Sequence, residues 1–510
     1  MILKNAFFLF QFLFSVQKQL SVIMINRYIR FFLFTIAISV CTLSSCTDEM
    51  ISTDPDYSLE FSTDTLSFDT IFSAIGSTTE KILIYNHNKR ALKISSVELA
   101  GGENSRFRLN VNGSRNPENS FKDIEIGAKD SLYIFVEVTV NPHDSDAPVL
   151  VSDSIVFQTN GNVQSVRLEA YGQDVILWKE KLILNDTVLS AARPYLVYGY
   201  LAVDSAKTLT LAAGCRIYFR NNANLLVYGN LVANGTAQSP VQLRGDRFDL
   251  VKFSDPLPYN HVAGQWGGVY LLWNQGRHKL NHVRLNSGYV GLYVPNSDRQ
   301  HLPVIEISNS VIHNFLLYGV VAQNANLKIH NSEVSNTGSY TLYLSGGTHE
   351  ILQSSILNFY NAGAGAATSR DKFPAVMIMG LNRAAAMNTI FRNSVITGTL
   401  ETELSIASRF MPYVDAEFTN NFIRRKAPYE MSQFVRNHWY EPGDTMLFKA
   451  SRYTLKPLQY FNFMPDSLSA LRGLADPAVA SQFPLDLNGN NRLSDGAPDA
   501  GAYEWIPVQQ

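Results

Sequence analysis

A short extended pattern recurs through the middle of this 510-residue chain, and it constrains the fold more than any other feature. Each copy places apolar residues on both sides of a polar centre that contains Asn, Ser or His. The copies span residues 280–285, 307–312, 329–334, 352–357, 391–396 and 418–423. Counted from Asn309 through Asn331, Ser354, Asn393 and Asn420, the steps are 22, 23, 39 and 27 residues. The longest step contains the small-residue stretch 361–367, which we interpret as an insertion.

A repeat of this length that contains only short strands has to follow a closed path. At a rise of about 3.3 Å per residue, it supplies three short strands and three turns. One repeat cannot bury its apolar side alone, but stacked repeats can, and strands of successive coils then pair in parallel about 4.8 Å apart. Asn and Ser at equivalent positions are expected to stack into a ladder along the axis, as amide side chains do in stacked strands.

The repeat resembles the right-handed parallel β-helix (pectate-lyase-like) superfamily over residues 176–425, which implies an all-β fold with a single-stranded coil. Upstream, residues 58–175 contain many short alternating segments, typical of an antiparallel β-sandwich. This segment, with Tyr85-Asn86 and the run 155–160, resembles the hydin-like immunoglobulin modules, and we interpret it as a spacer. We expect residues 426–510 to form a C-terminal extension and cap, because an open coil end exposes unpaired backbone.

The N-terminal residues have the pattern of an export signal. Two arginines precede a short apolar stretch at 31–40, which is typical of a secretory signal and too short to favour a membrane-spanning helix. The Leu-Ser-Ser-Cys sequence that ends at Cys46 resembles the bacterial lipobox. The resemblance implies that residues 1–45 are a signal peptide, with Met24 the true start, and that Cys46 is the lipidated residue.

Residues 46–57 are polar, and we expect a lipidated tether. Thr47-Asp48-Glu49 resembles the acidic export signal of Bacteroidota-type surface lipoproteins. This resemblance implies an outer-membrane protein that is held in the membrane by its lipid and faces the cell exterior. A plain solvated tether, which leaves the periplasmic face open, is the alternative.

Charge and cysteine content restrict the possible partners and chemistry. Lys and Arg total 42 against 44 Asp and Glu, a formal net charge of −2, which argues against a nucleic-acid partner because such proteins usually carry a basic face. Of the three cysteines, only Cys215 lies beyond the predicted tether. We expect it to be a small buried apolar residue, as free cysteines usually are.

A polysaccharide-cleaving site is the next possibility, because many β-helix proteins are polysaccharide lyases or hydrolases. Such sites need clustered carboxylates with basic residues beside them. The acidic residues between 262 and 400 are scattered, namely Asp298, Glu306, Glu333, Glu350 and Asp371. Glu306 and Glu350 precede similar strands but are expected two coils apart, roughly 10 Å. We therefore predict no catalytic residue, and lyase or hydrolase activity remains an alternative.

Aromatic residues provide the candidate binding site. Strand alternation places Tyr293 and Tyr343 on the outer face of one predicted sheet, and Trp266, Tyr270 and Trp273 belong to the preceding coil. Rings with flat apolar faces and polar edges suit stacking against sugars. We predict a non-enzymatic binding or adhesion module for a glycan or a protein partner. Rings that merely cover the sheet, in a structural envelope protein, are the remaining alternative.

The C-terminus carries two distinctive motifs, at 486–492 and 496–504, which resemble the closing segment of bacterial surface β-helix proteins. Asp486, Asn488 and Asn490 also resemble part of a calcium loop, although the EF-hand order is not met. A turn or cap and a calcium site therefore both stay open, and no other cofactor is predicted.

Overall fold

The computed structural model describes residues 50–507, except 74, 252–256, 297–300, 361–369, 371, 381–386, 408–413, 451–453, 456–457 and 460. The predicted signal peptide, Met24, Cys46 and the export signal at 47–49 lie outside the described residues. Strands dominate the described chain, which confirms the all-β fold class. No helix among the described residues has both the length and the apolar character needed to cross a membrane.

The chain divides into two compact units. One contains Thr79–Glu137 and Ser152–Glu169 with the chain up to Leu66, and the other contains Ser67–Thr78, Val138–Val151 and Ala170–Gln510. The predicted domain boundaries stay predictions.

Two five-stranded sheets precede the repeat region, in the orders β1-β3-β8-β5-β6 and β2-β10-β9-β4-β7. Their strands are β1 (Glu60–Phe61), β2 (Thr65–Phe72), β3 (Glu80–Tyr85), β4 (Leu92–Leu99), β5 (Phe107–Val111), β6 (Ser114–Arg115), β7 (Ser120–Ile126), β8 (Ser131–Val138), β9 (Val149–Thr159) and β10 (Asn162–Gln173), with the 3-10 helix η1 at Gly102–Asn104. The pairs β3–β8 and β4–β9 are antiparallel, and buried residues alternate with more exposed ones along β8. Such alternation is typical of a sheet with one covered face.

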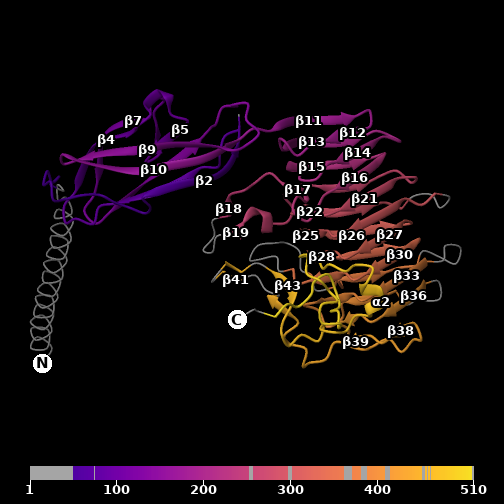
Figure 1. Cartoon of the computed structure of the whole chain (residues 1–510). Helices are drawn as coiled ribbons and strands as arrows, with labels where there is room; N and C mark the ends of the chain where they lie inside the picture. Colours follow the sequence, from indigo (N-terminus) through magenta and orange to yellow (C-terminus); the bar gives the residue numbers. More distant parts are fainter. Residues whose placement is uncertain are drawn as a thin grey trace, which may run out of the picture. The chain divides into compact units, whose positions relative to one another are not determined.

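Two long parallel sheets form the β-helix, and Figure 1 shows their strands stacked from β11 to β39. The 17-stranded sheet contains β11 (Ile176–Ile183), β13 (Tyr195–Val203), β15 (Arg216–Val227), β17 (Val241–Gly245), β20 (Gly268–Leu271), β22 (Val283–Asn286), β23 (Val290–Val294), β25 (Val311–Phe315), β26 (Tyr318–Gln323), β28 (Glu333–Thr337), β29 (Leu342–Ser345), β31 (Ser355–Asn358), β32 (Val376–Ile378), β34 (Val395–Gly398), β35 (Leu404–Ile406), β37 (Phe422–Ile423) and β39 (His438–Trp439). The 10-stranded sheet contains β12 (Thr187–Leu189), β14 (Thr208–Leu211), β16 (Asn230–Asn234), β21 (Arg277–Asn281), β24 (Val304–Ser308), β27 (Asn326–His330), β30 (Thr348–Leu352), β33 (Met387–Arg392), β36 (Val414–Thr419) and β38 (Phe434–Val435).

A coil of the repeat region supplies three strands, as the repeat length predicts. In one coil these are β24, β25 and β26, and they pair in parallel with β27, β28 and β29 of the next. The remaining short elements are β18 (Leu250–Val251), β19 (Leu257–Pro258), η2 (Tyr259–His261), β40 (Phe448–Ala450), β41 (Thr454–Leu455), β42 (Leu458–Gln459), β43 (Asn462–Pro465) and the helix α2 (Pro477–Ala480). The parallel β-helix is therefore confirmed.

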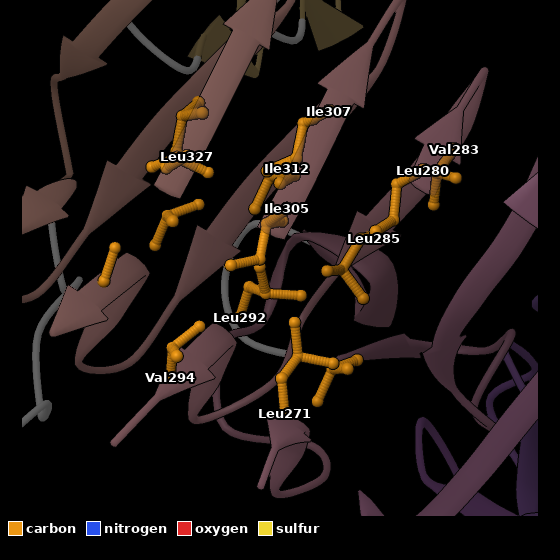
Figure 2. Close-up of a cluster of buried hydrophobic side chains, with 14 of the residues drawn as sticks. Leu271, Leu280, Val283, Leu285, Leu292, Val294, Ile305, Ile307, Ile312 and Leu327 are labelled. Carbon is orange, nitrogen blue, oxygen red and sulfur yellow. The ribbon is translucent and has the colours of Figure 1, made fainter. Parts of the chain in front are cut away.

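The inward residues of successive coils make one continuous apolar core. Figure 2 shows part of it, in which Ile305 and Leu327 occupy equivalent positions of successive coils and Leu292 and Ile312 belong to the 17-stranded sheet. Cys215 belongs to this core and is fully buried, which confirms the expectation for the lone thiol, and burial raises its pKa to about 12. A thiol with such a high pKa is protonated at neutral pH and is a poor nucleophile.

The predicted ladder is present at the turns that follow β24, β27, β33 and β36 of the 10-stranded sheet. Asn309, Asn331, Asn393 and Asn420 have positive φ values of 51, 44, 53 and 55°, a region that Asn tolerates better than most residues. Asn331 Nδ2 donates to Asn309 Oδ1 at 2.8 Å. In the third coil the turn residue is Gln353, with φ 48°, rather than the predicted Ser354. Ser354 belongs to a neighbouring ladder, in which the backbone N–H of Ser332 donates to Ser354 Oγ at 3.2 Å.

Two segments of the C-terminal extension have different roles. Residues 429–439 close the last coil, and residues 485–504 run along the side of several coils. Tyr429, Phe434 and Trp439 pack against the end of the core. Residues 485–504, here called the C-terminal strap, instead bond to the ladder: Asn331 Nδ2 donates to the Leu485 carbonyl at 3.1 Å, and Gln353 Nε2 donates to the Asp499 carbonyl at 2.6 Å. The closing motifs therefore lie along several coils and not across the coil end.

Candidate functional site

A row of outward side chains crosses six neighbouring strands of the 17-stranded sheet. Parallel register places six residues in consecutive coils, namely Tyr270, Tyr293, Val321, Tyr343, Met377 and Ser405. Their strand neighbours, such as Leu292, Leu342 and Leu344, lie in the core, so this row faces away from it. Its tyrosines are partly buried, so part of each side chain is accessible.

Three further rings extend this row. Tyr318 and Tyr340 stack with 6.3 Å between centroids and 11° between planes, and Tyr340 contacts Tyr343 at 5.5 Å. Phe373 meets Tyr340 edge-on at 5.1 Å, and Tyr270 lies 5.8 Å from Tyr293. We call the six rings the tyrosine strip; its members are Tyr270, Tyr293, Tyr318, Tyr340, Tyr343 and Phe373.

Sequence analysis predicted three members of the strip and missed three. Tyr318 and Tyr340 lie at or just before the start of β26 and β29, where strand alternation gives no guide. A signal was nevertheless present, since the two tyrosines are separated by 22 residues, which is the step between Asn309 and Asn331.

The structure removes Trp266 from the candidate site. Its side chain is fully buried and stacks on Phe219 with 4.2 Å between centroids, and its Nε1 donates to the Asn286 carbonyl at 2.9 Å. Trp273 follows β20 in a turn and is partly buried. Among the described residues, it has no ring contact with the tyrosine strip. Of the five predicted ligand-binding residues, only Tyr270, Tyr293 and Tyr343 belong to one surface.

Burial favours the neutral form of three hydroxyls of the strip. It raises the pKa of Tyr270, Tyr340 and Tyr343, and neighbouring tyrosines raise these pKa values further. Tyr343 Oη donates to Met379 Sδ at 3.3 Å. At neutral pH the strip therefore presents apolar ring faces and neutral hydroxyl groups.

Among the scattered carboxylates that the structure describes, Glu306 and Glu350 do not form a catalytic pair. Glu306 and Glu350 lie two coils apart, as predicted, and Lys328 occupies the position between them. Glu350 Oε1 lies 3.8 Å from Lys328 Nζ and 2.7 Å from His330 Nε2. Asp298 and Asp371 lie outside the described residues. The carboxylate of Glu350 is thus held by basic groups on its own sheet.

A Ser–His–Glu group on β25 and β28 of the 17-stranded sheet lacks the geometry of a catalytic triad. His313 Nδ1 lies 2.7 Å from Ser335 Oγ and 3.6 Å from Glu333 Oε1, so both partners share one ring nitrogen. In a triad they bond to opposite nitrogens. Tyr503 Oη donates to Glu333 Oε2 at 2.5 Å, and Ser335 is fully buried. This network fastens the C-terminal strap to β28.

Asp486 is a turn acceptor within the strap. Its Oδ1 accepts from the backbone N–H of Asn488 at 2.9 Å and of Asn490 at 2.7 Å, and its Oδ2 accepts from Asn490 Nδ2 at 3.0 Å and from the Glu504 N–H at 2.9 Å. Calcium takes six to eight oxygen ligands. The described part of the chain contains no group of three or more His, Cys, Asp or Glu side chains placed to hold a metal ion.

Comparison with known proteins identifies no family. No family model and no curated protein matches the chain. Among solved structures, a family 123 glycoside hydrolase from Clostridium perfringens matches with 10% identity and a TM-score of 0.16, over 23% of this chain and 26% of the hydrolase. A protein of unknown function from Porphyromonas gingivalis W83 matches with 10% identity and a TM-score of 0.17, over 25% of this chain and 60% of that protein. The PapD-like domain 7 of human CEP192 matches with 12% identity and a TM-score of 0.16, over 26% of this chain and 95% of the domain. Likenesses this weak carry no argument about function.

Proposed function

We propose that this protein is a lipid-anchored cell-surface protein whose β-helix binds glycan without cleaving it. The observation that carries the proposal is the tyrosine strip, in which the partly buried rings of Tyr270, Tyr293 and Tyr343 share one row of the parallel register, with Val321 in the coil between the last two. Such rings offer an apolar face with a polar edge, which matches the alternating apolar and hydroxylated faces of a sugar.

The anchor part of the proposal rests on the sequence around Cys46. The basic and apolar leader and the Leu-Ser-Ser-Cys ending together support lipidation at this residue. Lipidation with more than one acyl chain makes membrane attachment stable, whereas a single chain attaches reversibly. The acidic residues that follow Cys46 support export to the exterior face of the outer membrane.

Replacement of two strip tyrosines tests the binding function. We expect Tyr293→Ala and Tyr343→Ala each to weaken binding to the best ligand of a glycan array by about tenfold, because truncation of an aromatic anchor commonly costs at least about 1.4 kcal/mol. Isothermal titration with the purified mature chain measures the loss, and circular dichroism checks that the fold is kept.

Tyr228 provides the matched control. It is 43% exposed in the turn between β15 and β16, outside the strip, so Tyr228→Ala should bind like the wild type. Unchanged binding in the Tyr293→Ala, Tyr343→Ala double variant would dismiss the strip as the binding site. Absence of any glycan ligand would favour a structural role in the envelope.

A further inference from the structure

We propose that the glycan bound by the tyrosine strip is an uncharged polysaccharide that lies along the coil axis; this inference rests on the proposed glycan-binding function. The first observation is the composition of the surface. The strands that carry the row are β20, β23, β26, β29, β32 and β35, and none of their residues is Asp, Glu, Lys or Arg.

The lack of charge is local to this side of the β-helix. On the outer face of the 10-stranded sheet, the same coils place Lys279, Glu306, Lys328 and Glu350 in register, one residue per coil. Glu417 continues this row two coils later and accepts from Arg392 Nε at 2.9 Å. Soluble proteins usually spread charges of both signs over their surface. The six described strands of the row therefore differ from the neighbouring sheet in carrying no charged residue, and the composition of the whole chain does not explain this difference.

An acidic polysaccharide does not fit the strip. Its carboxylates would have to lose water, and a carboxylate without a cationic partner is costly to desolvate. Arginine is the usual partner for a carboxylate, since its guanidinium forms paired hydrogen bonds with both oxygens. Arg370, near Phe373, is buried and bonds to Glu403 and Thr399. Lys372, next to Phe373, is exposed at the edge of the strip. A neutral sugar needs no cation, and its hydroxyls can bond to the tyrosine hydroxyls and to water.

The direction of the polymer follows from the ring positions. Each of β20, β23 and β29 carries one ring of the row, so a ligand that contacts several rings must cross the strands. From Tyr270 to Tyr343 the row spans three strand spacings, about 14 Å. One sugar unit per coil position would place successive units about one strand spacing apart. The rings of the row therefore match about three to four sugar units.

The test compares neutral and acidic polymers on the purified mature chain. The probes are soluble neutral β-glucan, galactan and mannan, together with polygalacturonate and alginate, each titrated at low and at high sodium chloride. We expect at least one neutral polymer to bind with a Kd that changes less than twofold with salt, and the acidic polymers to bind at least tenfold more weakly. For the neutral ligand, the affinity of a series of oligosaccharides should rise with length and level off at about four units.

The outcomes separate this inference from the proposed function. Tight binding of an acidic polymer that weakens tenfold or more at high salt would overturn the neutral class while glycan binding stood. Affinity that stops rising at a single sugar unit would overturn the axial path. A failure of all three neutral polymers to bind would overturn this inference, and the proposed function would fall with it only if the glycan array also gave no ligand. Lys372→Ala is the control for the exposed edge cation, and it should leave neutral binding unchanged.

Discussion

At the residue scale, Gln353 joins two parts of the molecule. Its side chain is fully buried and occupies a turn position with φ 48°. Its Nε2 donates to the carbonyls of Asp499 and Gly501 at 2.6 and 3.1 Å, and its Oε1 accepts from Asn393 Nδ2 at 2.9 Å. One amide therefore connects the ladder to the C-terminal strap.

We expect Gln353→Ala to lower the free energy of unfolding by about 3 kcal/mol, because it leaves buried polar partners without hydrogen bonds. Urea denaturation followed by circular dichroism measures the loss. Gln482→Ala is the control, since Gln482 is exposed just outside the strap and should change stability by less than about 0.5 kcal/mol. Equal stability of the two variants would show that the strap does not depend on Gln353.

The candidate site could be predicted from the sequence only where strand alternation is regular. Tyr270, Tyr293 and Tyr343 lie inside short strands, so the period of two places them correctly. Trp266 has the same parity as Tyr270 but points into the core. Gly268 lies between them with φ 134°, a conformation that interrupts the alternation. Such a backbone change is invisible in a pattern of apolar and polar residues.

At the element scale, the 10-stranded sheet buries two histidines in the core. His278 of β21 and His349 of β30 have pKa values lowered to about 4 and about 3 by burial. Their Nδ1 atoms have partners, the Leu231 N–H at 3.2 Å and Thr389 Oγ1 at 3.2 Å, and neither Nε2 has a partner among the described residues. Both rings are therefore neutral in the folded protein.

These histidines make the fold sensitive to mild acid. In the unfolded chain they titrate near pH 6.5, so below that pH the unfolded state binds protons that the folded state does not. Their contribution is complete above pH 6.5 and is lost as the pH falls towards 4. Between pH 7.5 and 5.0 the loss is about 2 kcal/mol per histidine.

The variants His278→Leu and His349→Leu should each flatten the fall in stability between pH 7.5 and 5.0, measured by urea denaturation at both values. His301→Leu is the control, because His301 is exposed and should leave the pH dependence unchanged. If the wild type and both core variants lost the same stability between pH 7.5 and 5.0, these two histidines would not be the cause of the acid sensitivity.

The repeated elements were predictable, whereas the packing of the C-terminal strap was not. Three strands per coil follow from repeat length and strand rise alone. The strap bonds to coils more than 140 residues earlier in the chain, through contacts such as Ser355 Oγ with the Ala502 N–H at 2.9 Å. Such a contact is made once and leaves no period in the sequence. The prediction of Ser354 as a ladder residue was wrong for a similar reason. The turn position of that coil holds Gln353 where the neighbouring coils hold asparagine, so the pattern of asparagines did not reveal it.

At the scale of the whole molecule, the β-helix has sides of different chemistry. The C-terminal extension covers one outer face of the 17-stranded sheet, where Leu357, Val395 and Phe422 pack against Phe448 and Phe463. The 10-stranded sheet carries the charged row. The tyrosine strip lies on and beside β20, β23, β26 and β29, whose residues include no Asp, Glu, Lys or Arg. The chain therefore builds from one repeat a covered side, a charged side and a side suited to an uncharged ligand.

Attachment of this molecule to a membrane depends on Cys46 in the proposed function, and substitution of that residue tests it. Wild-type protein expressed in a bacterium with lipoprotein processing should incorporate labelled palmitate and sediment with membranes. Cys46→Ser should do neither, because serine offers no thiol for the first acyl group and the loss of all chains removes the apolar surface that holds the protein in the bilayer. Cys41→Ser is the matched control, since Cys41 lies in the predicted leader and should leave labelling intact. Palmitate label that persists in Cys46→Ser, or disappears in Cys41→Ser, would contradict the assignment of the anchor.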